Sequence, residues 1–237
     1  NKAGSTSDGD NSEKPKSRRK QGKSKSKRKA SKHSPSKSLK LVPWPTGWSN
    51  LGVSMRFLHN MFSRIEPHTT TRQLVEHIVL QETGARLGQN ASSGVQHGGS
   101  YVEYLKLNNQ LDFHGNSVVG VATHYVSHAW DATFVELISA LDVLITTQHL
   151  NPATTFFWID IFSLSQHMAH QNQLDENDDV EVKTRDAIKN LDCFVLVIGS
   201  WNSPFALSRT WCLWELLCAL SAKRQIEVCM PGKSLHD

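Results

Sequence analysis

One acidic side chain near the carboxyl end of the sequence lies in apolar surroundings. Trp211 and Glu215 are four residues apart, a spacing that places both on one face of a helix. A carboxylate beside an apolar stripe is costly unless it is paired, hydrogen-bonded or directed into a cleft, so Glu215 is a candidate for chemistry. The alternative is a partly exposed glutamate that pairs with Arg209 or Lys223. The neighbours that create the apolar surroundings are Leu213, Trp214, Leu216 and Leu217.

Four apolar runs in the second half of the chain are predicted to be the strands that position this glutamate. Helical patterns lie between them, and strands that are apolar on both faces and alternate with helices form a parallel sheet covered on each side. The predicted fold class is therefore α/β, a doubly wound sheet, for which right-handed crossovers permit the flavodoxin-like strand order 2-1-3-4-5. The strand runs are residues 118–126, 154–162, 193–198 and 226–230, and the principal helices are residues 134–145, 184–191 and 211–224.

That strand order opens a ligand crevice between the carboxyl ends of the first and third strands. Its walls are predicted to be residues 127–131 on one side and residues 199–202 on the other. The chain stops soon after the fourth strand, so a fifth strand and its helix, if the fold includes them, would lie beyond Asp237 and the sheet would be truncated.

The first half of the chain divides into two segments of different composition. Residues 1–40 contain 14 Lys and Arg against 3 Asp and Glu, net +11, with almost no apolar residue, so we expect a disordered basic tail. Residues 41–117 are predicted to be an N-terminal extension of helices and loops without a chemical signature. Apolar residues at helical spacing predict a helix over residues 51–62, and capping-box spacing marks helix starts at Thr70 and Ser100. The tail could contact nucleic acid non-specifically, through its charge.

The composition excludes several classes of protein. The longest apolar runs are far shorter than a bilayer span and no charged-then-apolar leader opens the chain, so we expect a soluble protein without membrane contact. Four cysteines lie in apolar runs without CxxC spacing, which is typical of reduced core thiols in a cytoplasmic or nuclear protein. His167 and His170 form an HxxH pair without a third ligand at a fixed spacing, so no metal site is predicted.

Three segments together resemble the Toll/interleukin-1 receptor (TIR) domain family. The run VLVIGS, followed by SRTWCLWELL, is similar to the family's strand, loop and helix with its Trp-x-x-x-Glu element. HYVSHAWD is similar to the Phe-Ile-Ser-His-Ala-x-x-Asp of bacterial members, and FFWIDIF is similar to the family's strand that ends in an aspartate. Their order and spacing agree with a TIR-like domain over residues 118–237, which implies a flavodoxin-like sheet.

The resemblance also implies a site and a reaction. Glu215 matches the carboxylate with which catalytic TIR domains cleave NAD, their substrate rather than a cofactor, at its nicotinamide–ribose bond. Nicotinamide leaves from a cationic pyridinium, so no general acid is needed, and a fixed anion stabilises the oxocarbenium-like ribosyl cation. Trp130 and Trp211 would stack on a ring and His128 would contact ribose or phosphate; core aromatics and an ordinary strand-end histidine are the alternatives. The residues predicted to bind the substrate are Ser127, His128, Trp130, Asp160, Ser200 and Trp211.

Three functions remain open from the sequence. The first is an NAD glycohydrolase that is active only when copies assemble, by self-association or with other TIR-like domains. The second is a non-catalytic TIR-like scaffold that recruits signalling partners through the same helix and loops. The third is a nucleic-acid-associated protein that binds through residues 1–40.

Overall fold

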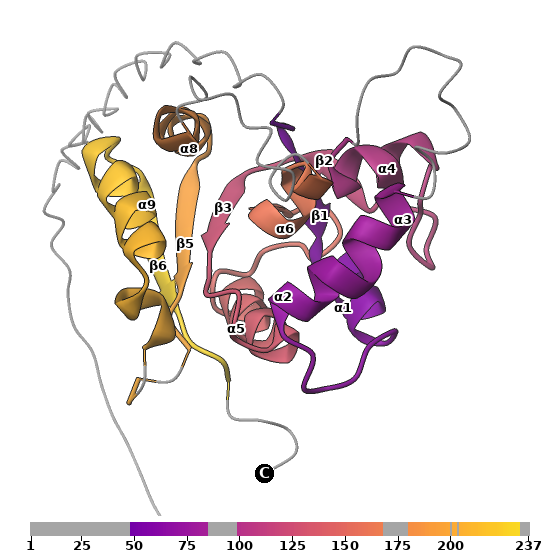
Figure 1. Ribbon diagram of the computed structural model, residues 1–237, viewed down its shortest axis with the longest axis horizontal. Helices are drawn as coiled ribbons and strands as arrows, with labels where there is room; N and C mark the ends of the chain where they lie inside the picture. The colour runs from indigo at the N-terminus through magenta and orange to yellow at the C-terminus, as the bar shows by residue number, and fades with distance from the viewer. Residues whose placement is uncertain (1–47, 85–98, 168–179, 200, 203, 233–237) are drawn as a thin grey trace, which may run out of the picture. The chain divides into compact units, whose positions relative to one another are not determined.

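The computed structural model describes residues 48–84, 99–167, 180–199, 201–202 and 204–232 (Figure 1). The predicted basic tail, residues 1–40, and its predicted contact with nucleic acid lie outside these ranges, as does Ser200. Within the described ranges, no helix combines the length and the apolar composition needed to cross a membrane.

The described strands form one six-stranded sheet, composed of β1 (Leu51–Ser54), β2 (Val119–Val121), β3 (His124–Ser127), β4 (Phe156–Ile159), β5 (Cys193–Val197) and β6 (Gln225–Cys229). Their order across the sheet is β2-β1-β4-β3-β5-β6. The last four strands of the chain pair in parallel, whereas β1 is antiparallel to both β2 and β4. The predicted α/β class is confirmed, and the predicted parallel sheet is mostly parallel, with β1 antiparallel to its neighbours. The parallel part, β4-β3-β5-β6, has an order compatible with the first four strands of a flavodoxin-like sheet.

Helices cover both faces of the sheet and bury two separate hydrophobic clusters. One cluster joins α1, α4 and α5 to sheet residues such as Val126 and Val195. The other cluster joins α8 and α9 to Tyr125 and Phe194, which precede those two residues in the same strands. Alternate residues of the central strands therefore face opposite layers, and Figure 1 shows α9 and α5 on opposite sides of β5. The helices are α1 (Met55–Phe62), α2 (Thr71–Leu74), α3 (Leu80–Gly84), α4 (Tyr101–Leu107), α5 (Phe134–Thr147), α6 (Asp160–Ser163), α8 (Val180–Lys189) and α9 (Thr210–Ser221), with a π-helical turn at Val75–Val79 and a 3-10 turn at Phe205–Ser208.

The helix starts predicted from capping boxes are confirmed. The backbone N–H of Gln73 donates to Thr70 Oγ1 at 3.2 Å, and the backbone N–H of Thr70 donates to Gln73 Oε1 at 2.9 Å. At the start of α4, the backbone N–H of Ser100 donates to Glu103 Oε2 at 2.8 Å. Local hydrogen bonding thus sets where α2 and α4 begin.

Residues 51–62 differ from the sequence prediction, which made them a single helical pattern. β1 occupies the first four positions, and the helix begins only after Ser54, whose Oγ accepts the backbone N–H of Phe57 at 3.3 Å. Because all four β1 residues are buried, their sequence lacks the alternation that would distinguish a strand from a helix. Described parts of residues 41–117, predicted to be an extension of helices and loops, therefore share the sheet and core of residues 118–232.

The first predicted strand, residues 118–126, is in fact two strands. β2 pairs with β1, and the chain then passes to the other side of β4, where β3 pairs. The Ala122 N–H donates to Asn50 O at 3.1 Å and the Thr123 N–H to Phe156 O at 3.0 Å, so the backbone stays hydrogen-bonded through the passage. Gly120 allows the β2 backbone to lie close to the Phe156 ring, because a Cβ at this position would collide with that ring.

Gly52→Ala tests whether β1 is an integral strand of the sheet. A Cβ at Gly52 would lie 2.5 Å from the backbone oxygen of Phe157, which cannot rotate away, so we expect a loss of about 1–3 kcal/mol in the free energy of unfolding. Thermal and urea denaturation measure it. Gly232→Ala is the matched control, since its Cβ would meet only Val143 Cγ2 at 3.4 Å and Ser139 Oγ at 3.5 Å. Equal stability of the two variants would contradict the pairing of β1 with β4.

Candidate functional site

Glu215 lies on the sheet-facing side of α9 and is only 3% exposed. Tyr125 Oη donates to Glu215 Oε1 at 2.6 Å, and the Ser127 hydroxyl donates to Oε2. Both donors belong to β3, where a spacing of two residues places them on the same face of the sheet. The alternative of a partly exposed glutamate paired with Arg209 is wrong, because Arg209 Nη1 donates to Asp131 Oδ2 at 2.8 Å instead.

Burial raises the pKa of Glu215 to about 8, and the negative charge of Asp160 contributes to the rise. Hydrogen bonds from Ser127, Tyr125 and Trp211 favour the ionised form and lower the pKa part of the way back. The carboxyl is therefore mostly protonated at pH 7 in the free protein. A cation bound beside it would favour the carboxylate.

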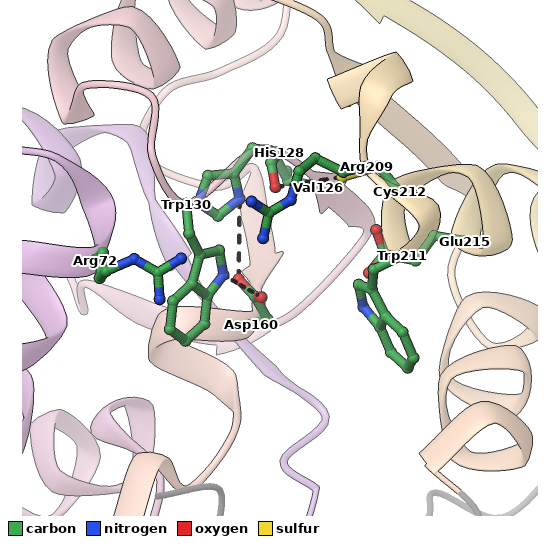
Figure 2. A pocket seen from close by; sticks show the side chains of 9 residues that line it. All are labelled: Arg72, Val126, His128, Trp130, Asp160, Arg209, Trp211, Cys212 and Glu215. Atoms are coloured by element: carbon green, nitrogen blue, oxygen red, sulfur yellow. Dashed lines mark hydrogen bonds and ion pairs between the residues drawn. The ribbon is translucent and has the colours of Figure 1, made fainter. Parts of the chain in front are cut away.

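A pocket of about 240 Å³ opens beside Glu215, at the carboxyl ends of β3 and β4 (Figure 2). Residues predicted to form the site line this pocket together: His128, Trp130, Asp160, Trp211 and Glu215. Ser127 belongs to the site through its hydrogen bond to Glu215, whereas Ser200 is outside the described residues. The wall facing β3 is formed by the start of α9 rather than by the described residues of 199–202, which is a correction to the predicted crevice. The remaining lining residues are Arg72, Val126, Arg209 and Cys212.

Asp160 and His128 lie together inside the pocket. The Trp130 indole Nε1 donates to Asp160 Oδ2 at 2.7 Å, and His128 Nδ1 lies 3.9 Å from Asp160 Oδ1. On its other side, His128 Nε2 is 3.2 Å from Thr71 Oγ1. Burial lowers the pKa of His128, so the ring is neutral at pH 7. Nε2 is therefore within hydrogen-bonding distance of a side chain, whereas Nδ1 lies beyond that distance from Asp160.

The two tryptophans face each other across the pocket, as Figure 2 shows. Trp211 is 40% exposed, so the alternative of a core aromatic is wrong for this residue. Trp130 is partly buried against the hydrophobic cluster under α5, and the guanidinium carbon of Arg72 lies 5.6 Å from its ring centroid. A planar ligand between the indoles could contact both.

Arg72 reaches the pocket because α2 is hydrogen-bonded to the loop that follows β3. The Thr71 N–H donates to Ala132 O at 3.1 Å and the Arg72 N–H to Trp130 O at 3.0 Å. Thr71 Oγ1 also donates to Trp130 O, at 2.9 Å. These contacts join segments far apart in the sequence, so nothing in the sequence connected Arg72 with the site.

Sequence reasoning also missed Tyr125 and Cys212. The position of Tyr125, two residues before Ser127 on a strand, was the one available signal that both would face the same helix. Cys212 carries a thiol whose Sγ donates to His128 O at 3.6 Å, and burial raises its pKa to about 11, so it is protonated at neutral pH.

In the described part of the chain, no group of three or more His, Cys, Asp or Glu side chains is arranged to hold a metal ion. Comparisons with family models, with curated proteins and with solved structures find no match.

Glu215→Gln tests the burial of this carboxyl through the pH dependence of stability. Because the pKa of Glu215 is raised to about 8 in the folded protein, from the usual 4.5, the folded state binds the extra proton between these values. Wild-type stability therefore falls as pH rises from about 5 to about 8, whereas the uncharged glutamine does not titrate. We expect the melting temperature of the variant, relative to wild type, to increase across this range.

The matched control is Glu181→Gln on the exposed part of α8, which removes a carboxyl that carries no burial cost. Its melting temperature relative to wild type should stay level over the same range. A level difference for Glu215→Gln as well would contradict a buried carboxyl with a raised pKa.

Proposed function

We propose that residues 118–237 belong to a TIR-like domain that cleaves NAD at the nicotinamide–ribose bond, with Glu215 as the catalytic carboxylate. The observation that carries the proposal is a buried carboxyl that lines a pocket between two tryptophans, without an arginine or lysine paired to it among the described residues. A structural glutamate would gain nothing from such a position, because burial without a cation destabilises its charge.

The electrostatics of Glu215 suit this reaction. Nicotinamide in NAD is a pyridinium cation, and a positive charge beside a carboxyl lowers its pKa, so substrate binding would itself ionise the glutamate. As nicotinamide leaves, the charge moves to the ribose, where the carboxylate would stabilise the oxocarbenium-like transition state. The hydrogen bonds from Tyr125 and Ser127 hold the carboxyl in place, so it need not reorganise during the reaction.

The size of the pocket suits one half of a dinucleotide. Sites that enclose a drug-sized ligand are usually about 300–1,000 Å³, and this pocket has about 240 Å³. The nicotinamide and its ribose would fit between Trp130 and Trp211, and the remainder of the molecule would extend past the mouth. His128, neutral and held by Thr71, is available to contact a ribose hydroxyl.

The flavodoxin-like classification is part of the same proposal. The order β4-β3-β5-β6 corresponds to strands two, one, three and four of that fold. A fifth strand beside β6, together with its helix, would complete it. Localisation in the cytoplasm or nucleus and assembly with copies or other TIR-like domains remain predictions from the sequence.

Nicotinamide release from NAD tests the proposal directly. We expect concentrated wild-type protein to release nicotinamide, and Glu215→Gln to lower the rate by about 100-fold or more, because the neutral amide cannot stabilise a ribosyl cation. Glu181→Gln is the control and should retain the wild-type rate. Chromatography of the products measures each rate. No release, or equal release from all three proteins, would rule out Glu215 as the catalytic group.

The pH dependence of kcat/KM provides a separate prediction. Since this quantity reports ionisations of the free enzyme, we expect it to rise from pH 6, to reach its midpoint near pH 8, where Glu215 is half ionised, and to level off at higher pH. Tyr125→Phe removes a hydrogen bond that favours the carboxylate, so the inflection should move to higher pH. Tyr104→Phe, on α4, is the matched control. A profile that is flat between pH 6 and 9, or one shifted downward by Tyr125→Phe, would contradict this assignment.

A non-catalytic interaction module is the second candidate function, and one observation favours it. Leu213, Leu217 and Leu220 of α9 are about half exposed and follow helical spacing, so they form an apolar stripe on the side of α9 away from the sheet. Self-association in light scattering, without nicotinamide release, would favour this candidate over the enzyme.

A further inference from the structure

Two arginines at the mouth of the pocket are tied to one carboxylate. Arg72 Nε donates to Asp131 Oδ1 at 2.9 Å, and Arg209 Nη1 donates to Asp131 Oδ2 at 2.8 Å. The three side chains are 44%, 46% and 54% exposed, so they lie where the pocket meets solvent. Arg72 and Arg209, which Asp131 bridges, are called the arginine pair below. Asp131 sets the position of one guanidinium relative to the other.

The arginine pair keeps hydrogen-bonding capacity toward the pocket. A guanidinium has five N–H donors, and Asp131 accepts one from each arginine. Both arginines line the pocket, and Asp131 is the acceptor of both guanidinium groups among the described residues. Figure 2 shows the Arg209 side chain directed into the space between Trp130 and the start of α9, and the Arg72 guanidinium beside the Trp130 ring. Each guanidinium can therefore donate hydrogen bonds to an anionic ligand and keep its hydrogen bond to Asp131.

The charges of the pocket separate an inner part from its mouth. Inside, Glu215 is mostly protonated at pH 7 and His128 is neutral, so neither attracts an anion. Asp160 also lies in the inner part of the pocket, where it accepts a hydrogen bond from the indole N–H of Trp130. The positive charge of the site is thus concentrated at the mouth, where Asp131 balances half of it.

We propose that the arginine pair binds the diphosphate of the ligand, so that the site selects diphosphate-linked nucleotides over nucleosides. The identity of the buried half of the ligand rests on the proposed function, whereas the diphosphate contact rests on the arginine pair itself. Two guanidinium groups held side by side match two adjacent phosphates, because each can make paired N–H to oxygen bonds. A ligand anchored at the mouth would project its distal ribose toward Glu215.

This assignment makes α2 part of the binding site. Arg72 comes from outside residues 118–237, and it is placed by the hydrogen bonds of Thr71 and Arg72 to Trp130 and Ala132. Residues 118–237 alone would therefore lack one of the two cations.

Binding of two non-reacting probes to the full chain tests the inference. ADP-ribose carries the diphosphate, whereas nicotinamide occupies only the inner part, and neither requires turnover. We expect Arg72→Gln and Arg209→Gln each to weaken ADP-ribose binding about tenfold or more, with the affinity for nicotinamide within about twofold of wild type. Higher salt should weaken ADP-ribose binding selectively, because exposed charges are screened. Isothermal titration calorimetry measures both affinities.

Arg185→Gln on α8 is the matched control, since it removes the same charge away from the pocket. Equal weakening by this control, unchanged ADP-ribose affinity in the two mouth variants, or equal loss of both probes would each overturn the inference. A different result, the absence of nicotinamide release, would contradict the proposed function without contradicting the diphosphate site. A protein that never releases nicotinamide but shows the expected binding pattern keeps the arginine pair as a diphosphate site and loses the enzymatic proposal.

Discussion

The burial of the Glu215 carboxyl against β3 is the constraint on which the pocket depends. Two hydroxyl groups, from Tyr125 and Ser127, hold its two oxygens, and no described cation neutralises it. Burial without a cation penalises the ionised carboxyl, so the pKa of Glu215 rises to about 8 and the group takes up a proton. α9, β3 and the mouth of the pocket are all arranged around this carboxyl.

A second constraint joins the N-terminal half of the chain to this pocket. α2 is hydrogen-bonded to the loop after β3, and β1 inserts between β2 and β4 in the same sheet. Thr71 consequently reaches His128, and Arg72 reaches both Trp130 and Asp131. The lining of the pocket is therefore composite: its inner groups come from β3, the end of β4 and α9, and part of its mouth comes from α2.

Local signals in the sequence predicted most of the elements but failed where the pairing partner decides the structure. The parallel strands, α5, α8 and α9 follow from apolar runs and periodicity, and the starts of α2 and α4 follow from capping boxes at Thr70 and Ser100. In contrast, β1 was predicted as helix and the β2–β3 segment as one strand. The first error arises because a short buried strand has no periodicity of its own. The second arises because one apolar run pairs with two different neighbours in the sheet, which only the folded chain reveals.

The sequence by itself determined the chemical types at the site and their order on β3, β4 and α9, since spacings of two and four residues place side chains on shared faces. The resemblance to the TIR family then brought His128, Trp130, Asp160, Trp211 and Glu215 into one hypothesis. Only the tertiary structure decided that Glu215 is sealed against two hydroxyls, that Arg209 pairs with Asp131, and that Arg72 joins them. Burial and long-range pairing decide pKa values and ion pairs, and both are properties of the packed chain rather than of any short stretch of it.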